Sequence, residues 1–124
     1  YLTMMALFDK TALTETERQI ILMTNNRLNG CTYCMAAHTA VSQRAGVDDS
    51  VIEALRRGVA LEDSKLEALR VFADIIHQSR GRPTPEQIDD FLAAGYTQQS
   101  VLEVIVGTSL KVLSNYTTPI TQPS

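Results

Sequence analysis

This sequence of 124 residues predicts an all-α fold, and three observations support that prediction. Apolar residues recur at the three- and four-residue spacing of a helix face through most segments. Capping residues and glycines divide these segments at lengths typical of helices. No segment shows the alternation of a half-buried strand, and no internal repeat or interdomain linker is visible. We therefore expect one domain, residues 1–124, folded as a helical bundle.

Two helices are expected before Gly30. Because the chain begins at Tyr1 without a methionine, we interpret residues 1–12 as the end of a truncated N-terminal helix. Thr14 and Glu17 form the capping-box pattern that starts a second helix. The apolar residues of this second helix are Ile20, Ile21, Leu22, Met23 and Leu28.

Glycines bound the next two helices. One is expected over about 31–45, between Gly30 and Gly46. A shorter helix over about 48–57 begins with an aspartate cap and stops at Gly58.

Three further helices and a tail complete the chain. A longer helix is expected over about 63–80, and residues 84–87, Thr-Pro-Glu-Gln, start a short helix that ends near Gly95. Thr97 caps the last helix, which is apolar on more than one face. We interpret that pattern as an indication of oligomer formation, although a central core helix would show the same pattern. Residues 117–124, which include two prolines, are expected to form an extended tail.

Composition excludes several classes of protein. The net charge of -3 gives no electrostatic reason to expect nucleic acid or anionic lipid as a partner. The apolar runs are too short to span a membrane, and no signal peptide is visible. Two cysteines in one C-x-x-C motif are typical of a catalytic or metal-binding pair rather than a disulfide scaffold. They favour a reducing compartment, so we expect a cytoplasmic protein with no nucleic-acid or membrane partner.

The segment from Asn29 to His38 holds both cysteines and one of the two histidines. In a helix that starts at Cys31, both Cys34 and His38 lie within about 60° of Cys31 on one face. Cys34 and His38 are then an i,i+4 pair. A thiol pair able to form a disulfide, with a base one turn away, predicts redox chemistry.

The position of the motif favours a thiolate. Gly30 places the cysteines in the first helical turn, where free N–H groups and the helix dipole favour negative charge. His38 can take a proton from Cys34 and then stabilise the thiolate as imidazolium. The second thiol can attack the oxidised first one, which closes a Cys31–Cys34 disulfide before irreversible oxidation. Helix electrostatics alone favours Cys31 as the stronger acid.

Two other interpretations of the motif need no redox chemistry. In the first, both cysteines are small buried apolar groups and His38 is a core histidine. In the second, Cys31, Cys34, His38 and His77 bind zinc. Zinc sites built on C-x-x-C usually have a second ligand pair at close spacing, whereas His77 stands alone. We therefore interpret His77 as a surface residue and expect neither a metal nor a bound cofactor.

The motif resembles the AhpD-like alkylhydroperoxidase group of the carboxymuconolactone decarboxylase family. The resemblance covers roughly residues 13–116. Its most specific part is Asn29-Gly30 followed by C-x-x-C-x-x-x-H. The other segments that fit the pattern are Ala45-Gly46-Val47, Phe72-Ala73, Arg80-Gly81, Ala94-Gly95-Tyr96 and Asn115-Tyr116.

The resemblance implies an AhpD-like bundle of about six to seven helices that assembles into trimers or hexamers. It also implies a peroxidase that reduces hydroperoxides, with Cys34 as the peroxidatic cysteine, Cys31 as the resolving cysteine and His38 in the proton relay. A hydroperoxide is then the substrate, and an external dithiol or disulfide reductase recycles the pair. The redox-active disulfide takes the place of a cofactor.

The chain departs from this family at two places. The relay glutamate of the family lies twelve positions before the first cysteine, where this chain has Gln19. Glutamine can hydrogen-bond but cannot carry a proton away. Glu15, one turn earlier on the same face, is a candidate to replace it, or an exposed acid that favours the helix dipole. Family members often read Asn-Tyr-Thr-Asn-His where residues 115–119 read Asn-Tyr-Thr-Thr-Pro, so a second histidine is absent.

We therefore expect an antioxidant thiol peroxidase or disulfide oxidoreductase. One alternative is a carboxymuconolactone decarboxylase-type enzyme, although the resemblance implies that those enzymes do not work through a cysteine pair. The other alternative is a non-enzymatic redox-sensing module whose assembly responds to disulfide formation, because Gln19 interrupts the relay.

Overall fold

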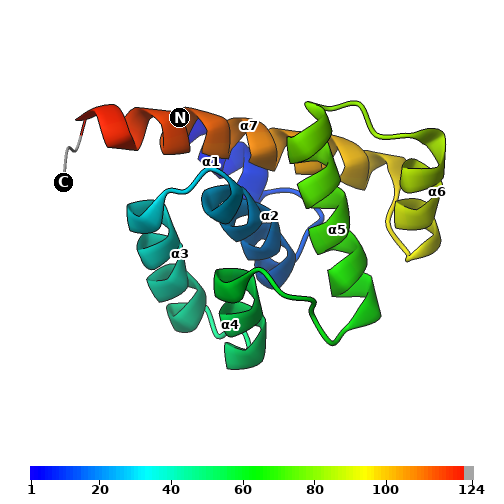
Figure 1. Ribbon diagram of the computed structural model, residues 1–124, viewed down its shortest axis with the longest axis horizontal. Helices are drawn as coiled ribbons and strands as arrows, with labels where there is room; N and C mark the ends of the chain where they lie inside the picture. The colour runs from blue at the N-terminus through cyan, green and yellow to red at the C-terminus, as the bar shows by residue number, and fades with distance from the viewer. Residues whose placement is uncertain (122–124) are drawn as a thin grey trace.

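The computed structural model describes residues 1–121, and within them the chain forms seven α-helices and no strand (Figure 1). The all-α prediction is confirmed. Within residues 1–121, no helix combines the length and the apolar composition that a membrane crossing requires. The helices are α1 (Leu2–Asp9), α2 (Glu15–Leu28), α3 (Thr32–Arg44), α4 (Asp49–Arg57), α5 (Ser64–Ser79), α6 (Pro85–Ala93) and α7 (Gln98–Thr121).

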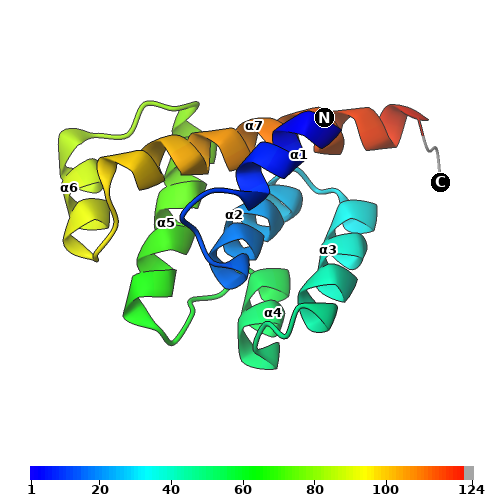
Figure 2. The same ribbon diagram turned by 180° about the vertical axis from the view of Figure 1, so that it is seen from behind.

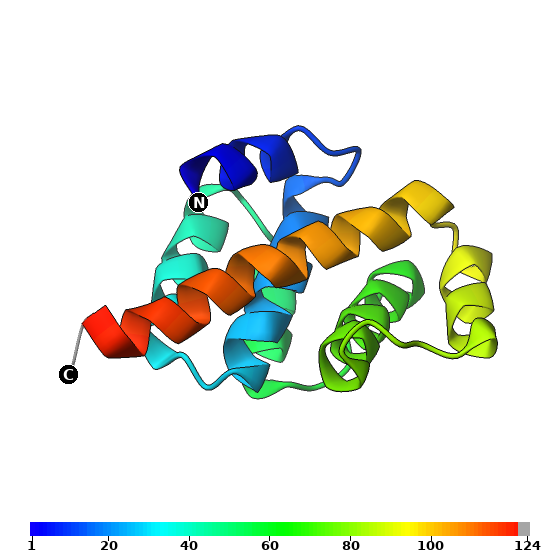
Figure 3. The ribbon, with the colours of Figure 1, turned by 90° about the horizontal axis from the view of Figure 1, so that it is seen from above.

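Helix α2 is the centre of the fold, because it packs against α3, α4, α5 and α7. Helix α7 is the longest helix and runs across the molecule over α2 and α5, as Figure 3 shows from above. Helix α1 packs along α7, which is seen from behind in Figure 2. The polar side chains of α2 can therefore reach α3 on one side and α7 on another.

The helix ends follow the capping residues. Thr14 Oγ1 accepts a hydrogen bond from Glu17 N at 3.1 Å, and Glu17 Oε1 accepts one from Thr14 N at 2.9 Å. Thr84 and Gln87 exchange the same two bonds at the start of α6. These two reciprocal capping boxes satisfy backbone donors that would otherwise lack partners. The capping boxes fix where α2 and α6 begin, as the sequence predicts.

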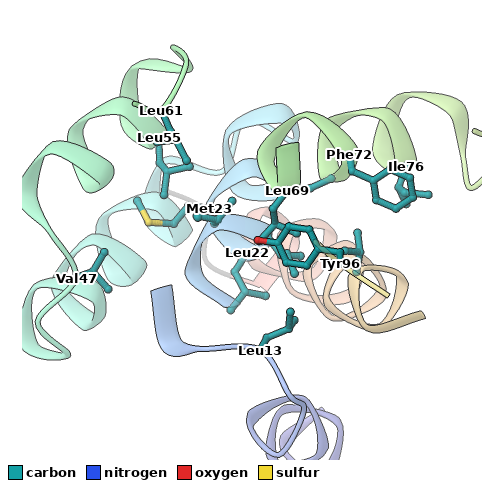
Figure 4. Packing of buried hydrophobic residues seen from close by; sticks show 14 of the residues in the cluster. Leu13, Leu22, Met23, Val47, Leu55, Leu61, Leu69, Phe72, Ile76 and Tyr96 are labelled. Carbon is teal, nitrogen blue, oxygen red and sulfur yellow. The ribbon is translucent and has the colours of Figure 1, made fainter. Parts of the chain in front are cut away.

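An apolar core joins α2 to the helices around it. In Figure 4, Met23 of α2 lies between Leu55 of α4 and Leu69 of α5. Phe72 stacks on Phe91 and Phe91 stacks on Tyr96, with ring centroids 4.1 and 4.6 Å apart. The aromatic stack holds α5, α6 and the start of α7 together, because stacked rings bury a large apolar area in one place.

The extended tail expected for residues 117–124 is wrong over the part that the structure describes. Residues 117–121 form the last turns of α7, and residues 122–124 lie outside the described residues. Pro119 removes a single backbone donor from the helix. The hydroxyls of Thr117 and Thr121 each donate to the backbone carbonyl one turn earlier, so these threonines are compatible with a helix.

Gly107 lies where α7 approaches α1 and α2 most closely. A Cβ atom at this position would lie 2.7 Å from Ile21 Cγ2 and 3.0 Å from Phe8 Cζ. Both of those side chains are buried, so neither can move aside cheaply. Gly107→Val is therefore expected to lower the free energy of unfolding by about 2 kcal/mol through overpacking. Urea unfolding measures this loss.

Ser109→Val is the matched control, because Ser109 lies on the exposed face of the same helix. It introduces the same β-branched side chain without the contact to α1 and α2. Equal losses in the two variants would mean that helix propensity, and not the helix crossing, sets the stability at position 107.

Candidate active site

The two cysteines lie at the junction between α2 and α3. Gly30 has φ 69°, a left-handed conformation that glycine adopts without a Cβ penalty, and it turns the chain between the two helices. Cys31 is the N-cap of α3, and its Sγ accepts a hydrogen bond from Cys34 N at 3.3 Å. A disulfide joins Cys31 to Cys34. The prediction that these two thiols can pair is confirmed.

Three asparagines hold this junction against α7. Asn26 Nδ2 donates to the carbonyl of Cys34 at 3.2 Å, and Cys31 N donates to the carbonyl of Asn26 at 3.0 Å. Asn115 of α7 donates to Asn26 Oδ1 at 2.9 Å and accepts from Asn29 Nδ2 at 2.9 Å. Asn26 and Asn115 are buried, so these bonds are costly to leave unmade. The backbone of the motif is therefore fixed by side chains from two helices.

A row of four side chains from three helices passes beside the motif. Lys111 Nζ lies 3.1 Å from His38 Nε2, and His38 Nδ1 lies 3.0 Å from Gln19 Oε1. Gln19 Nε2 donates to Glu15 Oε1 at 3.0 Å. The row thus connects α7, α3 and α2. We call Lys111, His38, Gln19 and Glu15 the relay row.

The hydrogen bonds of the relay row fit one arrangement of protons. The Lys111 ammonium has only donors, so His38 Nε2 must accept and carries no proton. Nδ1 of the neutral ring then donates to Gln19 Oε1, and the Gln19 amide donates onward to the Glu15 carboxylate. In each hydrogen bond of the row, the donor is therefore the side chain nearer α7 and the acceptor is the side chain nearer the Glu15 end of α2. The row therefore has a positive end at Lys111 and a negative end at Glu15.

The protein surroundings keep His38 neutral. Burial lowers the pKa of His38 to about 4, and the nearby Lys111 ammonium adds to that effect. Burial also lowers the pKa of Lys111 to about 8. Partial burial acts to raise the pKa of Glu15, but hydrogen bonds from Arg18 and Gln19 outweigh it and lower that pKa overall. His38 is thus a neutral base over the physiological pH range.

Stability of the disulfide form is expected to depend on pH through His38. Between pH 4 and 6.5 the unfolded chain binds a proton at this ring that the folded chain does not bind, so the free energy of unfolding rises with pH in this window. The expected rise is about 2 kcal/mol, after allowance for the partial exposure of the ring. The same reasoning for Lys111 predicts a second rise between pH 8 and 10.5.

Urea midpoints of the parent and His38→Gln, measured from pH 4 to 7, check the first rise. His77→Gln is the control, because it removes the other histidine of the chain. A parent whose pH dependence survives unchanged in His38→Gln would show that a group other than His38 causes it.

The structure brings together most of the residues that the sequence singled out, but it does not join His38 to the cysteines. Both ring nitrogens of His38 have other partners, and among residues 1–121 no hydrogen bond connects His38 to either sulfur. The side-chain oxygen near Cys34 Sγ is the hydroxyl of Thr118, at 4.0 Å. Cys34 and His38 nevertheless lie one turn apart on α3, as predicted.

His77 lies away from this site. It is half-buried, and its Nδ1 lies 3.0 Å from Oδ1 of the buried Asn25, so the prediction of a surface residue is only partly right. Within the described residues, no group of three or more histidine, cysteine, aspartate or glutamate side chains is placed to hold a metal ion. The four-ligand zinc arrangement considered from the sequence is therefore not formed there.

Sequence reasoning missed Lys111, Asn26 and Thr118. Lys111 had a usable signal, because it is a single charge between Leu110 and Val112 in an otherwise apolar part of the last helix. The roles of Asn26 and Thr118 had no such signal, because each depends on how α7 crosses the α2–α3 junction.

A groove of about 750 Å³ lies between α5 and α7, apart from the disulfide. Its lining includes His77, Arg80, Ile105 and Tyr116, but neither cysteine and no member of the relay row. The groove and the sulfur atoms are therefore separate features of a single chain.

This fold resembles that of a solved structure. One similar solved structure is that of an uncharacterized peroxidase-related protein from Silicibacter sp. TM1040, with a TM-score of 0.81 and 19% sequence identity. The alignment covers 96% of this chain and 66% of that chain, so this chain spans just under two thirds of its length. This likeness concerns the fold. A search of curated proteins found no match.

A sequence profile supplies the family. The profile of the carboxymuconolactone decarboxylase family matches residues 2–74, more than half of the 124 residues. The matched region contains the cysteine pair, His38, Gln19 and Glu15, whereas Lys111 lies beyond it. The chain belongs to the carboxymuconolactone decarboxylase family.

Proposed function

We propose that this protein is a thiol-dependent peroxidase and disulfide oxidoreductase that reduces hydroperoxides. The observation that carries the proposal is the Cys31–Cys34 disulfide at the start of α3, beside the hydrogen-bonded row of Lys111, His38, Gln19 and Glu15. The peroxidase-related structural neighbour agrees with it, although that protein shares only the fold. A disulfide between cysteines three positions apart can be opened and closed by exchange with an external thiol.

The proposed reaction balances over two thiols. The Cys34 thiolate attacks the peroxide, the O–O bond breaks, and an S–O bond forms to give a sulfenic acid and an alkoxide, which takes a proton to leave as an alcohol. The Cys31 thiolate then attacks the Cys34 sulfur, which forms the S–S bond and breaks the S–O bond, and the departing hydroxide takes the proton that Cys31 gave up on ionisation and leaves as water. An external dithiol or disulfide reductase supplies the two electrons that reopen the disulfide.

The geometry fits a resolving role for Cys31. The bond from Cys34 N to Cys31 Sγ and the N-terminus of α3 both stabilise negative charge on Cys31. A stabilised thiolate is a good leaving group when the disulfide is reduced and is already ionised when it must attack the sulfenic acid. Cys34 lies on the His38 side of α3, and we assign it the attack on peroxide.

Assembly into a trimer or hexamer is part of the proposal. Helix α7 packs on α1, α2 and α5 with one face and exposes apolar side chains on the other. An exposed apolar face of this kind is typical of an interface between subunits. The exposed apolar residues are Leu102, Ile105, Val112, Leu113, Tyr116 and Ile120. We further propose a cytoplasmic location, where reductants can recycle the disulfide.

Thiol counting tests the proposal. The reduced protein is mixed with one equivalent of an organic hydroperoxide, and free thiols and alcohol are measured together. We expect the loss of two thiols per chain for each alcohol formed. Intact thiols after prolonged exposure would rule out the peroxidase, and a change of assembly on oxidation without catalytic turnover would favour the redox sensor.

The family name supports a second candidate, a decarboxylase of the carboxymuconolactone type. Release of carbon dioxide from a carboxymuconolactone by the parent, undiminished in the double variant Cys31→Ser/Cys34→Ser, would favour this reaction. We expect no such release.

A further inference from the structure

Lys111 is a buried amine without an acidic partner. Its side chain is 1% exposed, and its Nζ lies 3.1 Å from His38 Nε2 and 3.3 Å from Ser114 Oγ. None of the ion pairs formed within residues 1–121 includes Lys111. Burying a lone ammonium is costly, and an apolar side chain of similar volume would serve the packing better. Stability therefore does not explain a lysine at this position.

The position of Lys111 on α7 puts it on the helix face that meets the cysteine motif. Lys111, Asn115 and Thr118 are spaced i, i+4 and i+7, so they share one face of the helix. Asn115 holds the α2–α3 junction, and the Thr118 hydroxyl lies 4.0 Å from Cys34 Sγ. Lys111 contacts the side chain of His38, whose Cα atom is offset from that of Cys34 by about 6 Å along α3 because the two residues are one turn apart.

We propose that Lys111, held in place by its hydrogen bond to His38, takes up the proton that the Cys34 thiol gives up, and so replaces the carboxylate that Gln19 cannot supply. This inference deepens the proposed function and rests on it. The step starts from the neutral Lys111 amine of the reduced protein: the Cys34 S–H bond breaks and an N–H bond forms on Lys111 Nζ, which becomes the ammonium that donates to His38 Nε2. After the thiolate has attacked the hydroperoxide, the same proton goes to the departing alkoxide, which leaves as an alcohol. Lys111 is a positioning and proton-holding residue, since its contact is with His38.

The electrostatics of the relay row agrees with this assignment. The pKa of Lys111 is lowered to about 8 by burial, whereas that of His38 is lowered to about 4. The lysine is thus the member of the pair that exchanges a proton near neutral pH. The titratable groups that face Lys111 are His38 from α3 and, beyond Gln19, Glu15 from α2. Helices α1 and α5 also pack on α7 but contribute no ion pair to Lys111 within residues 1–121.

Alkylation of the reduced protein tests whether the positive charge of Lys111 stabilises the Cys34 thiolate. The rate at which iodoacetamide modifies Cys34, followed by mass spectrometry of the peptide in Cys31→Ser, is measured from pH 5 to 10 with the otherwise parental sequence and with Lys111→Met, Lys111→Arg and the exposed control Lys10→Met. We expect the midpoint to rise by about one pH unit in Lys111→Met, a tenfold loss of thiolate below the midpoint. Lys111→Arg and Lys10→Met should match the parent, because both keep a cation at position 111. An unchanged midpoint in Lys111→Met would overturn the proposal.

The titration of Lys111 itself tests whether this lysine holds the thiol proton. In protein labelled with ¹⁵N-lysine, the Nζ signal of Lys111, identified by its absence in Lys111→Arg, is titrated in the disulfide and reduced forms. We expect Lys111 to stay protonated to a higher pH in the reduced form, since it then holds the thiol proton. Identical titration curves in the two forms would overturn the proposal.

Turnover separates this inference from the proposed function. Peroxide turnover is expected to fall about 10²-fold in both Lys111→Met and Lys111→Arg, because a guanidinium does not release its proton. Parent-like turnover in Lys111→Arg would show that a fixed charge is sufficient and would overturn the proton-holding role. A parent that reduces no hydroperoxide would end the proposed function alone, because the alkylation and ¹⁵N readouts do not depend on turnover.

Discussion

Cys34→Ser is expected to lose peroxide turnover by about 10³-fold or more, because a serine hydroxyl does not form the ionised nucleophile that the reaction needs. Cys31→Ser is also expected to lose multiple turnover, for a different reason. It keeps the attacking sulfur but has no second thiol to close the disulfide. One equivalent of hydroperoxide should therefore convert it to a sulfenic acid and stop there.

Trapping of the sulfenic acid distinguishes the two variants. Dimedone adds to sulfenic acids, so mass spectrometry after peroxide treatment should find an adduct at Cys34 in Cys31→Ser and none in Cys34→Ser. The adduct in the opposite variant would exchange the roles of the two cysteines. That outcome would agree with helix electrostatics alone, because Cys31 accepts the Cys34 N–H and lies at the N-cap of α3.

The fold was predictable because its signals are local. The capping boxes at Thr14 and Thr84, and the glycines at 30 and 58, act within one or two turns of their own position. The tail was mispredicted for the same reason. Proline and threonine lower helix propensity locally, but residues 117–121 continue a helix that its earlier residues anchor by packing on α1, α2 and α5.

The site was only half predictable because its other half is remote in sequence. The spacing of Cys31, Cys34 and His38 within one helix gave one face of the site directly. The contact between Lys111 and His38 joins residues 73 positions apart, and its existence depends on the angle at which α7 crosses the core. No periodicity within α7 specifies that angle. A charged residue in an apolar helix does, however, indicate that some polar partner must be buried with it.

Exchanging two side chains of the relay row is expected to raise peroxide turnover. In the double variant Glu15→Gln/Gln19→Glu, the carboxylate would lie where Gln19 Oε1 now accepts from His38 Nδ1 at 3.0 Å. A carboxylate at Nδ1 makes Nε2 more basic and stabilises the protonated ring. We expect turnover to rise about 10²-fold, less than the roughly 10⁴-fold that such a pair contributes in serine-protease triads, because Lys111 already holds a proton beside His38.

The single variant Gln19→Glu is a weaker test, because its new carboxylate would face Glu15 at the 3.0 Å now spanned by the amide. Two carboxylates at that distance cannot both ionise cheaply, so one would stay protonated and the gain would be partly lost. Glu15→Gln alone is the matched control, since it also removes the ion pair with Arg18 but leaves His38 bonded to an amide.

The pKa of His38 is measured by NMR in the double variant and in Glu15→Gln. The comparison shows whether a change in turnover follows from a change in the basicity of His38. We expect the pKa to rise well above 4 in the double variant alone, and turnover to rise with it. A raised pKa without faster turnover would mean that proton transfer does not limit the reaction. Equal turnover and equal pKa in the two variants would mean that the side chain at position 19 does not control the histidine at all.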